Sequence, residues 1–266
     1  MIQITLIACP SIEPPRFRLT LLLLLICLNF TLPPAQGKAP VPVDLKSKLK
    51  RALAEGDADA AQKLLADPQA KQLRQADRLK YLYEVSAMKG DNKAAISTLN
   101  KLMALEPGKG EYLFRRAALY RGEKQYEKAL DDYDTILALK AGRSPWALIE
   151  RAAVFQAQGK NQQALMDLTE ASAYKHVQFE AWREACNLCI KMGKHKEAVS
   201  FADKIIKQSP GDATFYLIRA REYAKMNNLA AASKDLRTAE SIAPEDRAEI
   251  NLVRKELLRE LPAAGK

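Results

Sequence analysis

Residues 111–139 read EYLFRRAALYRGEKQYEKALDDYDTILAL, and their apolar residues fall into two separate helical stripes. The apolar positions recur at the 3.6-residue spacing of one helix face in each half: Leu113, Ala117 and Tyr120 in the first, and Ala129, Leu130, Tyr133, Ile136 and Leu137 in the second. The alternation of apolar and polar residues that is typical of strands is absent. The stretch therefore predicts two helices joined by a short turn.

The same hairpin recurs along the chain from residue 42 onward. A small residue marks each recurrence at spacings of 34 or 35 residues: Ala61, Ala95, Ala129, Ala164, Ala198 and Ala232. Five positions before these alanines stand residues that mostly favour turns: Gly56, Gly90, Lys124, Gly159, Gly193 and Asn227. A constant period of this length indicates a helical repeat array, in which each unit packs on its neighbours. We expect six such units over residues 42–245.

This pattern resembles the tetratricopeptide repeat family, whose 34-residue period, small-residue positions, aromatic position and closing proline are all represented. Proline closes three of the units: Pro107, Pro210 and Pro244. The resemblance implies an all-α fold, a right-handed α-solenoid of about six tetratricopeptide-type helix-turn-helix repeats. The first unit is degenerate, because Ala52 stands at the aromatic position and Pro68 cuts its second helix short.

The C-terminal segment, residues 246–266, predicts a capping helix followed by a tail. One face of this helix is apolar and carries Ile250, Val253, Leu257 and Leu261. The other face holds arginines. An apolar face turned inward and a charged face turned outward are expected of a helix that closes the end of a solenoid.

Residues 1–37 differ from the repeats and have the layout of a secretory signal peptide. A positive flank, an apolar run and two small residues follow one another: Arg16 and Arg18, residues 19–32, and Ala35 and Gly37. The apolar run is shorter than the roughly 20 residues that a membrane-spanning helix needs. We therefore expect cleavage, a short linker over residues 38–41, and an exported protein, periplasmic or secreted. The alternative is an uncleaved segment that anchors the chain in a membrane.

The chain has 42 Lys and Arg residues against 32 Asp and Glu, a formal net charge of +10. Basic and acidic residues are interspersed and no tract of five like charges occurs, so we expect no nucleic-acid binding. The excess favours an acidic protein or peptide partner and is compatible with association with an anionic membrane surface. Because nucleotide-binding, zinc-hydrolase and nucleophile-elbow motifs are absent, the sequence predicts a non-catalytic protein without cofactor or metal.

Cys186 and Cys189 form a C-x-x-C pair, which is compatible with redox or metal chemistry. In the repeat register, Cys186 stands at a small-residue position and Cys189 at the aromatic position. We therefore expect both thiols to be buried as small hydrophobic groups. A redox protein that uses this pair is the less favoured alternative.

The remaining candidates for chemistry are interpreted as ordinary surface or boundary residues. His176 and His195 lie at boundaries between helices, and neither has a neighbouring carboxylate cluster in the sequence. Asp131, Asp132 and Asp134 lie on a helix and lack the glycine and glutamate of a calcium loop. We expect these acidic side chains to be solvated.

In the tetratricopeptide repeat family the first helices of the units line a concave groove that holds a peptide or a partner helix. The resemblance therefore implies a partner-binding stripe opposite the core stripe of the first helices: Phe114, Arg121, Trp146, Ile149, Arg183, Asn187, Leu217 and Arg221. Aromatic and arginine side chains often carry much of the binding energy of an interface. The alternative is that Phe114 and Trp146 only fill the junctions between units.

Arg183 and Asn187 have the spacing of the first element of a carboxylate clamp in some family members. Ile218 stands where the clamp would place a second asparagine, so no clamp is expected. The sequence thus predicts an exported, non-catalytic adaptor that binds a partner peptide or helix in its concave groove. A membrane-anchored scaffold with an uncleaved N-terminal segment is the alternative.

Overall fold

The computed structural model describes residues 43–139 and 144–260, and the regular structure in these ranges is entirely helical. The predicted signal peptide over residues 1–37, the linker over residues 38–41, and Leu261 with the tail lie outside the described residues, as does the side chain of Leu257. No helix in the described ranges is both long and apolar enough to cross a membrane.

The described residues form thirteen α-helices, of which the first twelve pair into six hairpins. The hairpins are α2 (Val43–Ala54) with α3 (Ala58–Ala66), α4 (Gln75–Met88) with α5 (Asn92–Leu105), α6 (Gly110–Gly122) with α7 (Tyr126–Ala138), α8 (Pro145–Ala157) with α9 (Asn161–Ala171), α10 (Gln178–Lys191) with α11 (His195–Gln208), and α12 (Ala213–Lys225) with α13 (Leu229–Ile242). The short 3-10 helices η1 (Pro68–Gln72) and η2 (Pro244–Asp246) follow the first and sixth hairpins, and α14 (Arg247–Glu260) comes last. The predicted all-α solenoid of helix-turn-helix units is confirmed.

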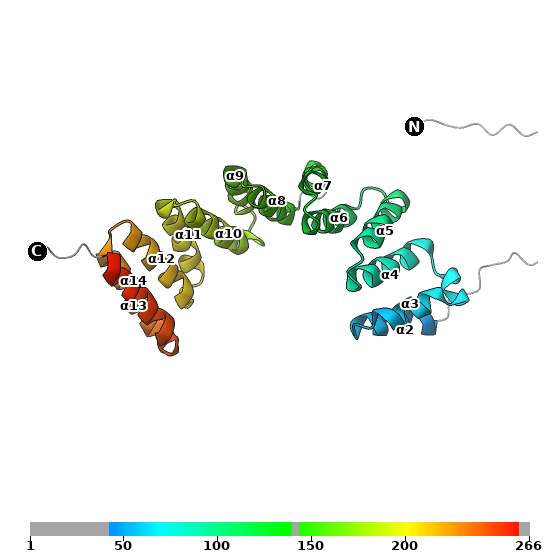
Figure 1. Ribbon diagram of the computed structural model, residues 1–266, viewed down its shortest axis with the longest axis horizontal. Helices are drawn as coiled ribbons and strands as arrows, with labels where there is room; N and C mark the ends of the chain where they lie inside the picture. Colours follow the sequence, from blue (N-terminus) through cyan, green and yellow to red (C-terminus); the bar gives the residue numbers. More distant parts are fainter. Residues whose placement is uncertain (1–42, 140–143, 261–266) are drawn as a thin grey trace, which may run out of the picture.

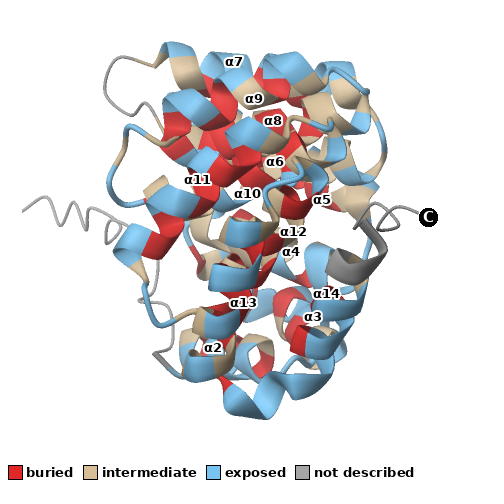
Figure 2. Cartoon of the chain, turned by 90° about the vertical axis from the view of Figure 1, so that its left-hand side faces the viewer, coloured by how far each residue is buried: buried red, intermediate tan, exposed pale blue. Residues whose placement is uncertain are grey.

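The hairpins stack side by side into an arch, in which each unit mainly contacts the units next to it (Figure 1). The first helices α4, α6 and α8 lie toward the inner side of the arch, and the second helices α5, α7 and α9 lie toward the outer side. Buried residues occupy the helix faces that meet a neighbour, and exposed residues cover the remaining faces (Figure 2). The core is therefore a ribbon that runs between the helices along the arch.

The turn inside every hairpin contains one residue in the left-handed backbone region. The φ values are +77° at Gly56, +68° at Gly90, +59° at Lys124, +73° at Gly159, +69° at Gly193 and +58° at Asn227. The residue after each of them donates its N–H to a carbonyl near the helix end, for example Asp57 to Ala52 at 2.8 Å and Asn228 to Tyr223 at 2.8 Å. This bond satisfies a carbonyl that the end of the first helix leaves unpaired. The turn-forming role predicted for these six positions is confirmed.

The six alanines that mark the repeat are all completely buried. In the third unit, Ala129 lies in one cluster with Leu113, Ala117 and Tyr133 from the two helices of the hairpin. A methyl group at this position lets the helix axes approach closely, and the larger side chains fill the space around it. The constant alanine therefore sets the packing distance within each hairpin.

An arginine on the first helix of three units binds two second helices at once. Arg151 Nε and Nη2 lie 2.8 and 2.7 Å from the carboxylate oxygens of Asp167 on α9, in the same hairpin. Arg151 Nη1 lies 2.6 Å from Asp134 Oδ1 on α7, in the preceding unit. The arrangement recurs in two other units: Arg116 with Asp132 and Asn100, and Arg219 with Asp235 and Asp203. We call these three sets the Arg–Asp bridges.

The expectation that the acidic side chains on α7 are solvated is wrong for Asp132. Asp132 is only 4% exposed and accepts two hydrogen bonds from Arg116, at 2.6 and 2.9 Å. Asp134 accepts a hydrogen bond from Arg151 of the following unit. A carboxylate is buried at acceptable cost when charged donors replace the water that it loses. Asp132 therefore holds helices together from a buried position, whereas Asp131 and Asp134 are exposed as expected, Asp134 with an ion pair to the next unit.

The fifth unit has apolar side chains in place of an Arg–Asp bridge. Ala185 and Phe201 stand at the register positions of the arginine and the aspartate, and both are buried. The same site between the two helices therefore accepts either a hydrogen-bonded ion pair or a small residue packed against an aromatic ring.

We predict that Asp167→Ala lowers the free energy of unfolding by about 2–4 kcal/mol, because Arg151 loses its bidentate partner in a mostly buried site. The double variant Arg151→Ala/Asp167→Phe copies the residues of the fifth unit and should recover most of this loss. Denaturant unfolding followed by circular dichroism measures both changes. Asp131→Ala, which removes an exposed carboxylate, is the control and should change stability by less than about 0.5 kcal/mol. A double variant as unstable as Asp167→Ala would contradict the interpretation.

Candidate functional site

A pocket of about 980 Å³ opens between the third and fourth units. We call it the central pocket; its lining among the described residues comprises Gly108, Gly110, Glu111, Phe114, Arg115, Ile136, Leu139, Ser144, Trp146 and Glu150. Phe114 on α6 is half-buried and packs edge-on against Tyr133, with ring centroids 5.8 Å apart. Trp146, in the first turn of α8, is 44% exposed, which is high for so large an apolar side chain. The pocket therefore presents two aromatic side chains from different units.

The end of α7 forms part of the lining of the central pocket. Ile136 is buried, and Leu139 follows the last residue of the helix. Gly110 allows Leu139 to lie close to the start of α6, because a Cβ at Gly110 would stand 3.3 Å from Leu139 Cδ1. The pocket is therefore lined both by the first helices α6 and α8 and by the end of the second helix α7.

The charged side chains around the central pocket are paired with one another. Arg115 Nη2 lies 2.8 Å from Glu111 Oε1, within α6. Arg121 Nη2 lies 2.9 Å from Glu150 Oε2, which joins the third unit to the fourth. Because each cation has a carboxylate beside it, the apolar lining rather than net charge dominates the pocket.

A smaller pocket of about 180 Å³ extends the groove toward the second unit. It shares Glu111 and Arg115 with the central pocket, and Tyr83 of α4 contributes a ring over which the Arg115 guanidinium lies at 5.2 Å. The two pockets together form a furrow along the inner side of α4, α6 and α8. This is the surface on which the sequence placed the partner-binding stripe.

Glu106, at the end of α5, binds side chains of both the second and the third unit beside the smaller pocket. Lys109 Nζ lies 2.7 Å away, the Tyr112 hydroxyl donates to the same carboxylate, and Lys80 Nζ lies 3.3 Å from it. Hydrogen bonds from Lys109, then from Tyr112, lower the pKa of Glu106 to about 2. Burial, together with the contact to Glu106, raises the pKa of Tyr112 to about 12. The carboxylate is therefore ionised and the phenol neutral at physiological pH.

Of the eight residues predicted for the groove, Phe114 and Trp146 meet in the central pocket, with Arg121 nearby through its pair with Glu150. Ile149 is only 8% exposed and belongs to the buried cluster between the fourth and fifth units. Its predicted place on an open groove surface is therefore wrong, because the fifth unit covers it.

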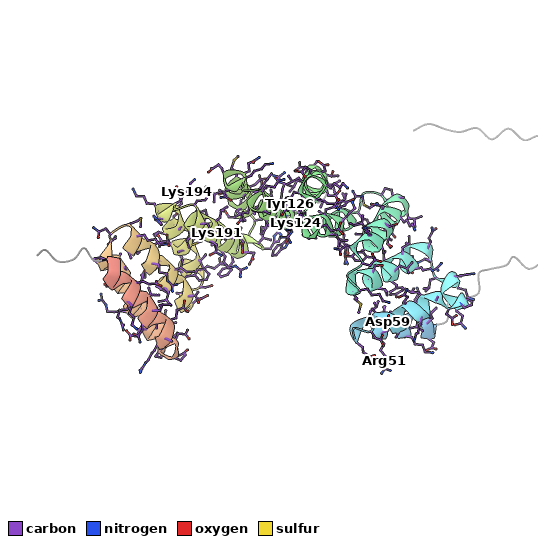
Figure 3. All side chains as sticks on the ribbon, viewed as in Figure 1. Arg51, Asp59, Lys124, Tyr126, Lys191 and Lys194 are labelled. Carbon is purple, nitrogen blue, oxygen red and sulfur yellow. The ribbon has the colours of Figure 1, made fainter. Side chains whose placement is uncertain are left out.

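Arg183 and Asn187 are exposed on α10, as predicted, but lie outside the central pocket. Arg183 forms ion pairs with Glu180 and, at 3.5 Å, with Glu184. The labelled charged residues in Figure 3 lie in different parts of the arch, from Arg51 and Asp59 in the first unit to Lys191 and Lys194 in the fifth. Basic groove residues thus carry carboxylate neighbours, and the charge excess is not concentrated at the central pocket.

The predicted exposure of Leu217 and Arg221 is wrong, because α14 covers them. Leu217 is only 2% exposed and clusters with Ile250 and Val253 of α14. Arg221 Nε lies 3.1 Å from Glu256 Oε2. In this structure these two residues bind a helix of the same chain.

Sequence reasoning missed the contributions of Ile136, Leu139 and Glu150 to the central pocket. Ile136 and Leu137 looked like ordinary core residues of the second helix. Glu150 approaches Arg121 across 29 positions of sequence, so no pattern within one helix reveals the pair. The pair could have been found only by aligning the third and fourth units with each other.

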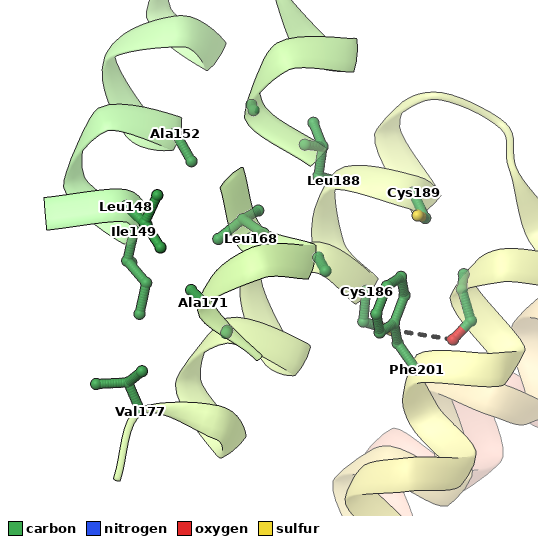
Figure 4. Close-up of a cluster of buried hydrophobic side chains, with 14 of the residues drawn as sticks. Leu148, Ile149, Ala152, Leu168, Ala171, Val177, Cys186, Leu188, Cys189 and Phe201 are labelled. Carbon is green, nitrogen blue, oxygen red and sulfur yellow. Dashed lines mark hydrogen bonds between the residues drawn. The ribbon is translucent and has the colours of Figure 1, made fainter. Parts of the chain in front are cut away.

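Cys186 and Cys189 are both buried, as predicted, and both thiols are free (Figure 4). The Cys186 thiol donates to the backbone carbonyl of Ala198 at 3.4 Å. Burial raises the pKa of Cys186 to about 12 and that of Cys189 to about 11. Thiols of this kind are poor nucleophiles at neutral pH.

His195 lies at a helix boundary, as expected, and contacts one carboxylate that is 27 positions away in the sequence. Its Nδ1 lies 2.6 Å from Oε2 of Glu222, which is 1% exposed, and Lys225 Nζ lies 2.8 Å from the other oxygen of that carboxylate. The contact joins the start of α11 to α12 and has a structural role. Within the described ranges, no group of three or more His, Cys, Asp or Glu side chains is placed to hold a metal ion.

The stacked hairpins and their concave pocket define the chain as an α-solenoid of helix-turn-helix repeats. Residues 213–246, which span the sixth unit, match the model of the family described as Tetratricopeptide repeat. The other units keep the same register, so the described part of the chain is an array of tetratricopeptide-type repeats. Comparison with curated proteins gives no match.

Several solved structures share this fold. A tetratricopeptide repeat protein from Parabacteroides merdae ATCC 43184 is 20% identical, with 83% of this chain and 93% of that chain covered and a TM-score of 0.57. PilF of Pseudomonas aeruginosa is 16% identical, with coverages of 80% and 97% and a TM-score of 0.56. YrrB, described as a TPR protein with an unusual peptide-binding site, is 19% identical, with coverages of 74% and 99% and a TM-score of 0.53. At these identities the similarity concerns the fold; proteins of this fold are generally non-catalytic scaffolds for protein–protein interaction.

We predict that Cys186 and Cys189 resist alkylation by iodoacetamide at pH 8 while the protein is folded, and react fully in guanidinium chloride. At a pKa of about 12, roughly one Cys186 thiol in ten thousand is ionised at pH 8. Mass spectrometry of the peptide that carries both residues measures the labelling. Rapid labelling of either thiol in the native protein would instead favour the redox alternative.

Proposed function

We propose that the protein is an exported, non-catalytic adaptor that binds a peptide or helix of a partner protein in the concave groove, with the central pocket as the main contact. The observation that carries this proposal is the 44% exposure of Trp146 beside Phe114 at the mouth of a pocket of about 980 Å³. Large aromatic side chains are rarely left open at the entrance of an apolar cavity without a partner to cover them.

The pocket favours a partner with a large apolar side chain. Phe114 and Trp146 contribute aromatic surface from two units, and Ile136 and Leu139 contribute aliphatic surface to the same pocket. A side chain that enters between the rings removes apolar surface of both molecules from water, which is the main source of affinity at such anchor points. The peptide-binding site named for YrrB supports a peptide as the occupant.

The charge of the partner is a secondary part of this proposal. An acidic partner is favoured by the net charge of +10, while the pairing of Arg121 and Arg183 with glutamates weakens that preference in the groove itself. Weak association of the positively charged protein with an anionic membrane surface is part of the proposal, and direct nucleic-acid binding is not.

We predict that Trp146→Ala weakens binding of the partner by about tenfold or more, as expected for loss of an aromatic anchor. The measurement is quantitative capture of envelope proteins by the immobilised full chain, followed by titration of the partner that is enriched. Arg183→Ala should have a smaller effect, because its guanidinium is already paired within α10.

Met166→Ala is the matched control for this experiment. Met166 is a large apolar residue that is 65% exposed on α9, a second helix on the outer side of the arch. Its removal should leave capture unchanged. Equal capture by Trp146→Ala and the native sequence would contradict the proposed use of the central pocket.

We predict that the native protein begins near Lys38, because export would remove the signal-like segment before it. N-terminal sequencing of the protein isolated from its source cells tests this. A native protein that keeps residues 1–37 and sediments with membranes would instead favour the anchored scaffold.

A further inference from the structure

The last helix, α14, lies against the first helix of the sixth unit as well as the second. It contacts both α12 and α13 closely. Elsewhere in the described chain, successive first helices such as α6 and α8 make few contacts with each other. The first helix of each unit packs mainly on the second helix of the preceding unit. Compared with the first helix of a further repeat, α14 therefore lies closer to the preceding first helix, α12, and covers more of its groove residues.

The apolar part of this contact is centred on Leu217. Leu217, Ile250 and Val253 form part of one buried cluster, and each is at most 2% exposed. Leu217 stands at the same register position as Phe114, which in the third unit lines the open central pocket. At this position the fourth unit has Ile149, which the fifth unit covers, and in the sixth unit α14 covers Leu217.

The polar part of the contact is made by Arg221 and two glutamates. Arg221 Nε lies 3.1 Å from Glu256 Oε2, and Nη1 lies 3.6 Å from Glu249 Oε1. The two glutamates are seven residues apart, so they lie on the same face of α14, on either side of Ile250 and Val253 along the helix. At the register position of Arg221, the fifth unit has Asn187, whose side chain is exposed.

We propose that the concave surface of the sixth unit is a docking site for an amphipathic helix with two acidic residues seven positions apart around an apolar pair, and that α14 fills this site until a partner helix of the same chemistry replaces it. The proposal rests on the adaptor function and adds to it the kind of partner and a means of control. The complementary charges of Arg221 and the two glutamates define the partner. Arg183 and Asn187 stand at the same register positions one unit earlier and extend the surface for a longer helix.

The first test measures whether α14 opens on its own. Hydrogen exchange of the full chain, followed by mass spectrometry, should show that amides of α14 exchange faster than those of α12 and α13 under native conditions. Exchange of α14 at the same rate as α12 would overturn the proposal, because a helix that opens only on global unfolding cannot be replaced by a partner.

The second test uses a fluorescein-labelled synthetic peptide of residues 244–260 and fluorescence anisotropy. The full chain with Ile250→Asp and Val253→Asp, which we call the released variant, should bind the peptide about tenfold or more tighter than the native sequence does, because attached α14 competes strongly. Adding Arg221→Glu to the released variant should weaken binding about tenfold. A peptide carrying Glu249→Lys and Glu256→Lys should restore binding to that triple variant.

Arg237→Glu in the released variant is the matched control, because it reverses the charge of an exposed arginine on α13 and should leave binding unchanged. Equal binding of the peptide to the native and released chains, or no effect of Arg221→Glu, would overturn the proposal. Trp146 takes no part in this experiment, so the docking site on α12 and the central pocket can each be disproved without the other.

Discussion

The arch depends on how closely two helices approach at one buried alanine in each hairpin. At Ala129, for example, a larger side chain would push α6 and α7 apart, and the left-handed residue at Lys124 fixes the angle at which α7 returns along α6. Both conditions are local, and both recur in every unit. Because identical hairpins leave identical faces uncovered, their stacking side by side follows from the hairpin geometry.

The contacts between units are more varied than those within them. The Arg–Asp bridges occur in three units, and each bridging arginine also binds the preceding unit, as Arg151 binds Asp134. A mostly buried ion pair contributes stability only where hydrogen bonds replace the lost water, and two hydrogen bonds from Arg151 to Asp167 meet this condition. These bridges consequently fix the orientation of successive units, and that orientation brings Trp146 of one unit and Phe114 of the unit before it to the same pocket.

The hairpins could be predicted from sequence because their determinants lie within about 34 residues of one another and repeat. The bridges left a signal as well, since Arg116 and Asp132 are 16 residues apart, and so are Arg219 and Asp235. That separation has no meaning until the hairpin register is known, which is why Asp132 looked solvated. The burial of Leu217 could not be predicted from the repeat register, because it depends on the position of α14, an element outside the six hairpins. Phe114 and Trp146 were found because their positions follow from the register of the first helices alone.

The net charge of +10 describes the whole chain and gives little information about the groove. A carboxylate of a ligand that approaches Arg121 or Arg221 must displace Glu150 or Glu256, which belong to the same chain and are therefore present at high effective concentration. An apolar side chain that enters beside Trp146 displaces only water. Affinity is therefore gained mainly at the apolar contacts, whereas the paired charges determine which sequences are tolerated around them. A helix that brings its own glutamates in the spacing of α14 satisfies both requirements, because it replaces one set of ion pairs with another of the same kind.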